Sequence, residues 1–130
     1  MKKILFLTFL LFTSFQIIVA QSAKGKEKTS VLRHVVMFKF KDNATPGEVK
    51  KVEDAFRSLQ DKISQIKSFE WGVNNSPEKL NQGLTHCFLV TFHSTKDRDA
   101  YLVHPAHMAF VEVLKPYFDK ATVLDYWAHK

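Results

Sequence analysis

The sequence has one cysteine, four glycines and no glycine-rich loop. The lone Cys87 excludes an internal disulfide, and its apolar strand-like surroundings favour a small buried hydrophobic residue over a nucleophile. Neither a phosphate-binding loop nor the Gly-x-Ser-x-Gly turn of hydrolases is present. No cluster of cysteines or carboxylates marks a metal site. What the chain does have is 12 phenylalanines and 6 histidines, so the search for a site turns to these.

Residues 1–20 are predicted to be a secretory signal peptide. Lys2 and Lys3 precede an apolar run, and the small residue Ala20 precedes Gln21. A transmembrane anchor is the alternative, because the run is almost long enough to span a bilayer. We expect a periplasmic or secreted protein without a stable membrane anchor after cleavage, with a flexible leader at 21–30 and one domain at 31–130.

The charge is mildly basic and dispersed. Loss of Lys2 and Lys3 lowers the basic count from 19 to 17 against 13 acidic residues, so the mature chain carries about +4. The lysines of the leader favour a solvated tail over a nucleic-acid partner. The remaining ~100 residues form one domain with a modest core, for which oligomerisation is an obvious source of further stability.

Apolar periodicity predicts six main elements in the order βαββαβ. Thr45 and Glu48 form a capping box, and Ser94 caps a short helix that carries Tyr101. This is the order of a ferredoxin-like α+β domain. The expected elements are strands at 31–40, 68–73, 84–92 and 121–127, a helix from Pro46 to Ile66, and a helix from Pro105 to about Phe118, which Pro116 ends or bends.

The topology assigns a role to each sheet face. The first and third strands are expected to be central neighbours, so His34 and His86 are predicted side by side on the helix-covered face. The opposite face is too apolar for water and needs a cover such as a second sheet. Its residues include Val35, Met37, Cys87 and Leu89.

The stretch from Tyr101 to His107 places one phenol and two imidazoles within seven residues. Pro105 suits the first helical position, and His107 shares the spacing of the apolar helix face. His107 is therefore predicted to point inward. It is either a neutral structural imidazole, bonded to Tyr101 or to a backbone carbonyl, or a functional group.

Four motifs together resemble the stress-responsive A/B barrel (Dabb) family over nearly all of residues 31–127. They are His34-Val-Val-x-Phe-Lys-Phe, Gly83-Leu-Thr-His86, Tyr101-x-x-His-Pro-x-His107 and Asp125-Tyr126. The resemblance implies a dimeric α/β barrel, with the homodimer formed through the exposed sheet face. By similarity to a plant polyketide cyclase of that family, His107 is the expected general base and Tyr101 the expected oxyanion donor. The implied ligand-binding residues are His34, His86, Phe38, Phe88, Phe118 and Asp125, of which Asp125 orients an imidazole.

Different functions fit these residues. The first is an exported homodimer that binds a small apolar or aromatic molecule between sheet and helices. The second is a cyclase- or lyase-type enzyme that uses His107 and Tyr101 in proton transfer. A metal site built on His104, His107 and either His34 or His86 is a third hypothesis. The resemblance also implies haem binding through a single histidine as an alternative, although no motif requires a cofactor or a metal.

Overall fold

A computed structural model describes residues 30–129 of the chain. The predicted signal peptide, residues 1–20, lies outside the described residues, as does the predicted leader up to residue 29. Within residues 30–129, no helix has both the length and the apolar character needed to cross a membrane.

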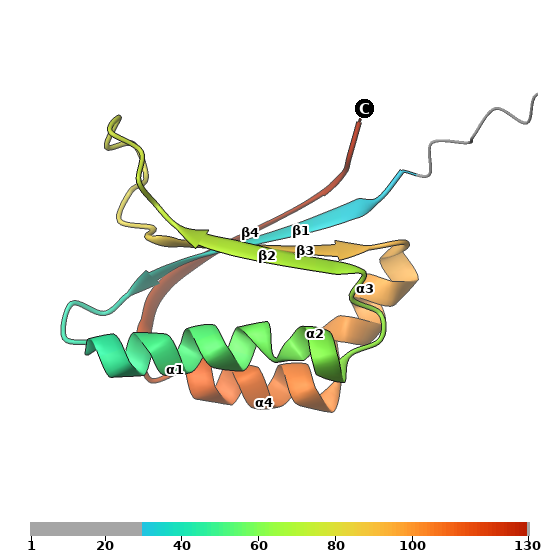
Figure 1. Cartoon of the computed structure of the whole chain (residues 1–130), viewed down its shortest axis with the longest axis horizontal. Coiled ribbons are helices and arrows are strands. Elements are labelled where there is room, and N and C mark those ends of the chain that lie inside the picture. Colours follow the sequence, from blue (N-terminus) through green and yellow to red (C-terminus); the bar gives the residue numbers. More distant parts are fainter. Residues whose placement is uncertain (1–29, 130) are drawn as a thin grey trace, which may run out of the picture.

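Four antiparallel strands form one sheet in the spatial order β2-β3-β1-β4. All helices lie on one face of this sheet (Figure 1). The order and the sheet topology confirm the predicted ferredoxin-like α+β fold. The elements are β1 Leu32–Phe40, α1 Pro46–Arg57, α2 Leu59–Lys62, β2 Ser68–Val73, β3 His86–Phe92, α3 Thr95–Leu102, α4 Pro105–Leu114 and β4 Phe118–Trp127.

Three helices begin at capping side chains. The predicted capping box of α1 is present, because the Glu48 N–H donates to Thr45 Oγ1 at 3.3 Å and the Thr45 N–H donates to Glu48 Oε2 at 2.8 Å. Ser94 Oγ accepts the Asp97 N–H at 3.0 Å at the start of α3. His104 caps α4, with Pro105 in the first turn. Local sequence thus fixes where the helices start.

The ends of two predicted helices differ from expectation. The first helix breaks at Ser58, whose hydroxyl donates to the Ala55 carbonyl at 2.8 Å and competes with the helical pattern. The last helix ends at Leu114 rather than near Phe118, because Pro116 has no N–H to continue it. Phe118 is therefore the first residue of β4, which starts earlier than predicted. The third strand begins at His86 rather than Leu84.

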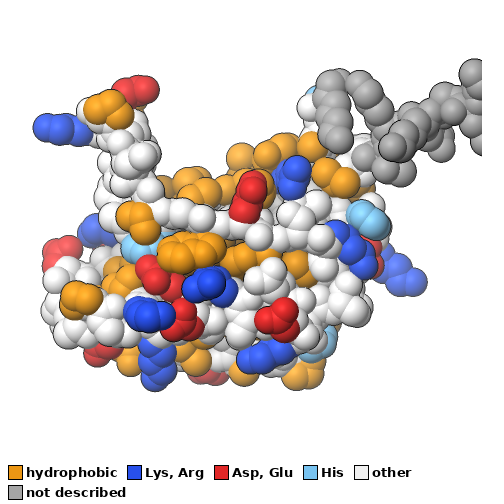
Figure 2. Space-filling view, viewed as in Figure 1, with side chains coloured by type: hydrophobic (Ala, Val, Ile, Leu, Met, Phe, Trp, Pro, Cys, Tyr) orange, Lys and Arg blue, Asp and Glu red, His pale blue; other side chains and the backbone are white. Residues whose placement is uncertain are grey.

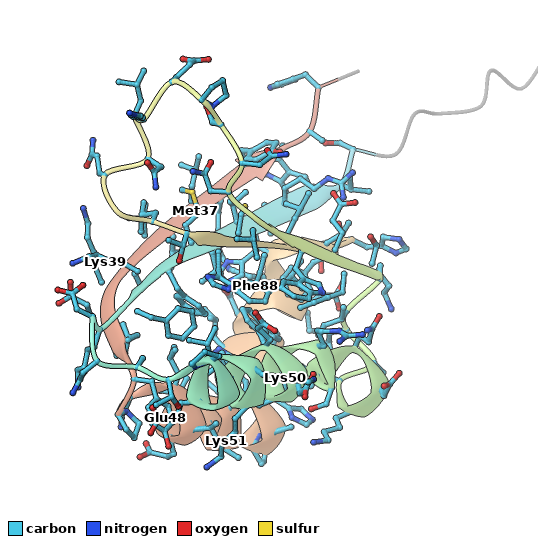
Figure 3. All side chains as sticks on the ribbon, turned by 60° about the vertical axis from the view of Figure 1, so that its left-hand side comes forward. Met37, Lys39, Glu48, Lys50, Lys51 and Phe88 are labelled. Carbon is cyan, nitrogen blue, oxygen red and sulfur yellow. The ribbon has the colours of Figure 1, made fainter. Side chains whose placement is uncertain are left out.

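The core between sheet and helices is built from phenylalanine rings. Phe56 of α1 lies 4.4 Å from Phe110 of α4 and 4.5 Å from Phe88 of β3, measured between ring centroids. Phe38 of β1 joins them at 5.4 Å from Phe88. In Figure 3, Phe88 lies between sheet and helices, whereas Met37 lies on the opposite side of the sheet. Strand alternation therefore separates the two faces as predicted.

The sheet face opposite to the helices carries exposed apolar side chains. In the β1–β4 register, Val35 lies opposite Leu124. Tyr126 is two residues further along β4 and takes the same side of the sheet. Leu124 and Tyr126 therefore join the predicted apolar face. Leu124 is 57% exposed. Hydrophobic side chains also emerge along the side of the sheet away from the helices in Figure 2. We call Val35, Met37, Cys87, Leu89, Leu124 and Tyr126 the outer sheet face.

Candidate functional site

A cavity of about 320 Å³ lies between the helix-facing side of β1 and β4 and the helices α3 and α4. Its lining includes Phe38, Phe110 and Phe118 and is apolar apart from four side chains. The cavity reaches solvent beside β4, where the lining residue Val123 is 56% exposed. The four polar side chains are those of His34, Tyr101, His107 and Asp125.

His107 has a defined tautomer in this cavity. Its Nδ1 lies 3.0 Å from the carbonyl oxygen of Leu102. Because a carbonyl oxygen only accepts hydrogen bonds, Nδ1 carries the proton, and a neutral ring then has its lone pair on Nε2. Burial lowers the pKa of His107, although the bond to Leu102 opposes this in part. The ring is therefore neutral at pH 7 and can accept a proton at Nε2.

The Tyr101 ring packs against both imidazoles. Its ring centroid is 4.4 Å from that of His107 and 5.7 Å from that of His34. The side chain is fully buried, and within the described residues its hydroxyl is the one buried side-chain polar atom without a hydrogen-bond partner. Burial raises the pKa of Tyr101, so the phenol keeps its proton and can donate it in a hydrogen bond.

His34 is held by a carboxylate on the neighbouring strand. Its Nδ1 lies 2.6 Å from Asp125 Oδ1, and Arg98 Nη1 lies 2.5 Å from Asp125 Oδ2. Burial acts to raise the pKa of Asp125, but the hydrogen bonds from Arg98 and His34 outweigh it and hold the pKa below its usual value. The carboxylate is thus ionised at neutral pH. Sequence reasoning missed Arg98, which belongs to no motif that marks the pocket.

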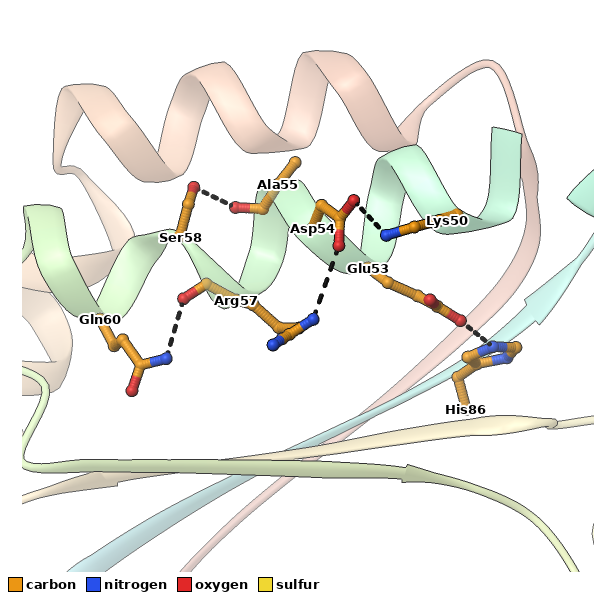
Figure 4. A network of polar contacts seen from close by, with 8 residues as sticks. All are labelled: Lys50, Glu53, Asp54, Ala55, Arg57, Ser58, Gln60 and His86. Atoms are coloured by element: carbon orange, nitrogen blue, oxygen red, sulfur yellow. Dashed lines mark hydrogen bonds and ion pairs between the residues drawn. The ribbon is translucent and has the colours of Figure 1, made fainter. Parts of the chain in front are cut away.

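His86 and Phe88 do not line this cavity. The β1–β3 register places His34 opposite Val90 and His86 opposite Phe38, so the two histidines are not side by side as expected. His86 Nε2 lies 3.0 Å from Glu53 Oε1 of α1 (Figure 4). The other ring nitrogen of His86, Nδ1, lies 2.8 Å from Thr85 Oγ1. Both ring nitrogens are therefore engaged. Phe88 belongs to the buried phenylalanine core.

His104 has a local structural role. Its Nδ1 accepts the Ala106 N–H at 3.1 Å and caps α4. Among residues 30–129, no three histidine, cysteine, aspartate or glutamate side chains are placed to hold a metal ion. In the described fold, the predicted residues that do meet in one cavity are Phe38, Phe118, His34, Tyr101, His107 and Asp125.

Two plant proteins are similar to the whole domain. The stress-response A/B barrel domain-containing protein HS1 of Arabidopsis thaliana is 35% identical over 101 residues, which is 78% of this chain and 93% of that protein. Olivetolic acid cyclase of Cannabis sativa is 29% identical over 99 residues, or 76% of this chain and 98% of the cyclase. The similarity therefore extends over nearly the full length of both relatives.

Solved structures share the fold. The hydroxynitrile lyase of Passiflora edulis matches with a TM-score of 0.74 and 25% identity, covering 78% of this chain and 96% of the lyase. A dimeric protein with a ferredoxin-like fold from Bacteroides fragilis matches with a TM-score of 0.63 and 26% identity, covering 75% of this chain and 96% of that one. The profile of the stress responsive A/B barrel domain matches residues 32–128. The chain therefore belongs to the stress responsive A/B barrel domain family.

Proposed function

We propose that this protein is an exported homodimer that binds a small, largely apolar or aromatic molecule in the cavity between sheet and helices. The observation that carries the proposal is the buried Tyr101 hydroxyl, which has no partner among the described residues. A buried polar group left unpaired costs about 1–3 kcal/mol, so such groups are nearly always bonded. A ligand oxygen inside the cavity would supply the missing acceptor.

The dimensions and chemistry of the cavity fit such a ligand. Its volume of about 320 Å³ lies at the small end of the range for small-molecule sites. The aromatic lining favours a flat apolar body, while the Tyr101 hydroxyl and the free Nε2 of His107 provide one donor and one acceptor. We infer a neutral molecule with an apolar body and a carbonyl or hydroxyl oxygen, because among the described residues the carboxylate that lines the cavity, Asp125, is already paired with Arg98.

Native mass spectrometry of the protein purified from its producing cells tests whether a small molecule occupies the cavity. The wild-type protein is expected to carry one small molecule per subunit. Tyr101→Phe and His107→Ala are expected to reduce its occupancy, whereas the exposed His93→Ala is not. Empty subunits in all variants, followed by no binding of benzaldehyde or acetophenone as probes, would contradict the proposal.

A second candidate is a lyase- or cyclase-type enzyme that acts on a carbonyl compound. The neutral His107 and the protonated Tyr101, with ring centroids 4.4 Å apart, favour this function. His107 Nε2 would take a proton from the carbon next to a carbonyl, and the Tyr101 hydroxyl would donate to the enolate oxygen that forms. Two relatives with enzyme names, a cyclase and a lyase, support this chemistry.

Exchange of the methyl protons of acetophenone in D₂O, followed by NMR, measures this step directly. The wild-type protein is expected to accelerate exchange above the buffer rate. His107→Ala should lose about 100-fold or more of the acceleration, and Tyr101→Phe a comparable amount. His93→Ala is the control. If exchange is no faster than in buffer while acetophenone binds, the cavity is a binding site without this activity.

The homodimer is proposed to form through the outer sheet face. The face is apolar and exposed, and structural relatives are dimeric. Leu124→Lys places a charge there and is expected to dissociate the dimer in light-scattering measurements. Val123→Lys is a matched control, because Val123 is equally exposed on the same strand but faces the helix side. A dimer that survives Leu124→Lys would refute this interface.

The proposal of export depends on residues 1–20. Cell fractionation followed by N-terminal sequencing checks it. The expected product is a protein outside the cytoplasm that begins at Gln21. A chain that retains Lys2 and Lys3 and sediments with membranes would indicate an anchor instead.

A further inference from the structure

We propose that the rim of the cavity mouth docks on the surface of an anionic phospholipid bilayer, from which the apolar ligand enters the cavity. This rests on the proposed binding of an apolar molecule between sheet and helices. Leu102 of α3, Val111 of α4 and Val123 of β4 all line the cavity. Leu102 and Val123 are also exposed to solvent. The cavity therefore opens between apolar side chains of different elements.

The helix layer leaves β4 uncovered beside this mouth. The helix-facing residue Val36 of β1 is buried, whereas Val123, its partner on β4, is exposed. In the same way Leu32 is buried, whereas its partner Trp127 is 41% exposed. Trp127 and Val123 are four residues apart on one strand and therefore take the same side of the sheet. An exposed apolar strip thus runs along β4 next to the opening.

The corner between α3 and α4 extends this apolar surface. Residues 100–111 include no lysine, arginine, aspartate or glutamate. Val103, which ends α3, is 76% exposed, and Met108 of α4 is 51% exposed. Met108 lies three positions before the cavity-lining Val111, so both are on the same side of α4. We call Leu102, Val103, Met108, Val123 and Trp127 the mouth rim.

The chemistry around the mouth rim suits lipid better than a protein surface. A protein interface normally has a polar periphery, where hydrogen bonds help to select the partner. Beside the mouth rim, Arg98 is already paired with Asp125, and Lys115 with Glu112. Exposed apolar side chains that include a tryptophan are instead typical of surfaces that enter the headgroup region of a bilayer. The proposed homodimer uses the outer sheet face and does not account for these exposed residues.

The basic segment before β1 complements an anionic lipid surface. Lys24, Lys26 and Lys28 alternate over five positions. They precede Leu32, which pairs with Trp127 of the mouth rim. The start of β1, the whole of α3 and the start of α4 lie at the same end of the domain (Figure 1). Lysines and a modest apolar surface act together in reversible membrane binding, and each lysine near anionic lipid strengthens it about fivefold.

Docking of the mouth rim would give the cavity access to molecules dissolved in the membrane. A neutral, largely apolar molecule partitions from water into the bilayer, because its apolar surface is then removed from water. With the mouth rim at the level of the headgroups, such a molecule would pass between Leu102 and Val123 and reach the Tyr101 hydroxyl without crossing bulk water.

Flotation of the mature protein, which begins at Gln21, with phospholipid vesicles tests the docking without any cavity ligand. The protein is expected to bind vesicles of phosphatidylcholine and phosphatidylglycerol, and to bind pure phosphatidylcholine about 10-fold more weakly or less. Val103→Asp and Met108→Asp should each weaken binding about 10-fold. Leu80→Asp is the matched control: Leu80 is 75% exposed, but the loop between β2 and β3 that carries it lies at the opposite end of the domain from α3 (Figure 1).

Quenching of tryptophan fluorescence by brominated lipid identifies the docked face independently of these variants. Trp127 of the mouth rim is expected to be quenched when the protein binds. Trp127→Phe should lose most of the quenching, because the second tryptophan of the described domain, Trp71, is half-buried and stacks on His86 at 6.5 Å between ring centroids.

Absence of vesicle binding would overturn the proposal, and so would equal binding by Val103→Asp, Met108→Asp and Leu80→Asp. A lower mass of Val103→Asp in light scattering without vesicles would also overturn it, because the mouth rim would then contact a second copy of the chain. Vesicle binding without acetophenone binding would refute the cavity ligand alone. Acetophenone binding without vesicle binding would refute the docking alone.

Discussion

Replacement of Tyr101 by phenylalanine separates a functional hydroxyl from a structural one. In most buried sites this change removes a hydrogen bond and destabilises the protein. Here the hydroxyl has no hydrogen-bond partner within residues 30–129, while the ring packs against His107, His34 and Phe92. Phenylalanine keeps those ring contacts and removes only the unpaired oxygen.

The expected effect on the ligand-free protein is an increase in stability. An unpaired buried hydroxyl destabilises the folded protein by about 1–3 kcal/mol. Its removal therefore stabilises the protein, although the small void left by the missing oxygen offsets part of that gain. We expect Tyr101→Phe to raise the free energy of unfolding by about 1 kcal/mol. For a domain of ~100 residues this corresponds to about 4–8 °C in Tm. Affinity for an oxygen-bearing ligand should fall about 2- to 10-fold, because the net value of one hydrogen bond is about 0.5–1.5 kcal/mol.

Thermal unfolding followed by circular dichroism, at one fixed protein concentration, measures the first effect. Isothermal titration with acetophenone measures the second. Tyr117→Phe is the control, since Tyr117 is half-buried and its ring, with the Lys51 ammonium 5.9 Å from the centroid, is retained. A Tm that falls by several degrees in Tyr101→Phe would refute the reasoning, because the hydroxyl would then make a stabilising bond in the ligand-free protein.

Three further predictions concern stability. The pKa of His107 is lowered on folding, so the unfolded chain binds more protons than the folded one just below pH 6.5. The free energy of unfolding should therefore fall as the pH drops through this window. In urea titrations, His107→Gln should remove this part of the pH dependence. Thr45→Ala should cost about 1 kcal/mol in the same assay through loss of the α1 cap, whereas a change below ~0.3 kcal/mol would mean that water replaces it. Phe56→Ala should cost about 3–5 kcal/mol, because its ring packs against those of Phe38, Phe69, Phe88 and Phe110, and an intact Tm would show that the core collapses around the void.

The sequence was sufficient for the fold because its signals are local. Alternating apolar residues from Leu32 to Phe40 specify a strand whose buried face is the one predicted, and Thr45 and Ser94 start helices through their own side chains. The same local reasoning placed His107 and Tyr101 together, since the Pro105 corner brings them within six positions of each other. Where a helix stops was harder to predict, because Ser58 and Pro116 compete with a continuing apolar pattern.

Only the tertiary structure decided which histidine enters the cavity. His34 and His86 follow the same alternation, but the strand register places them four positions apart along β1, and their partners differ. His34 meets Asp125 from 91 positions away, whereas His86 meets Glu53 from 33 positions away. Arg98 meets Asp125 across 27 positions and carries no local signal of that contact. The apolar periodicity of a strand indicates which face a side chain takes, but the partners it meets on that face depend on how elements distant in the sequence pack together.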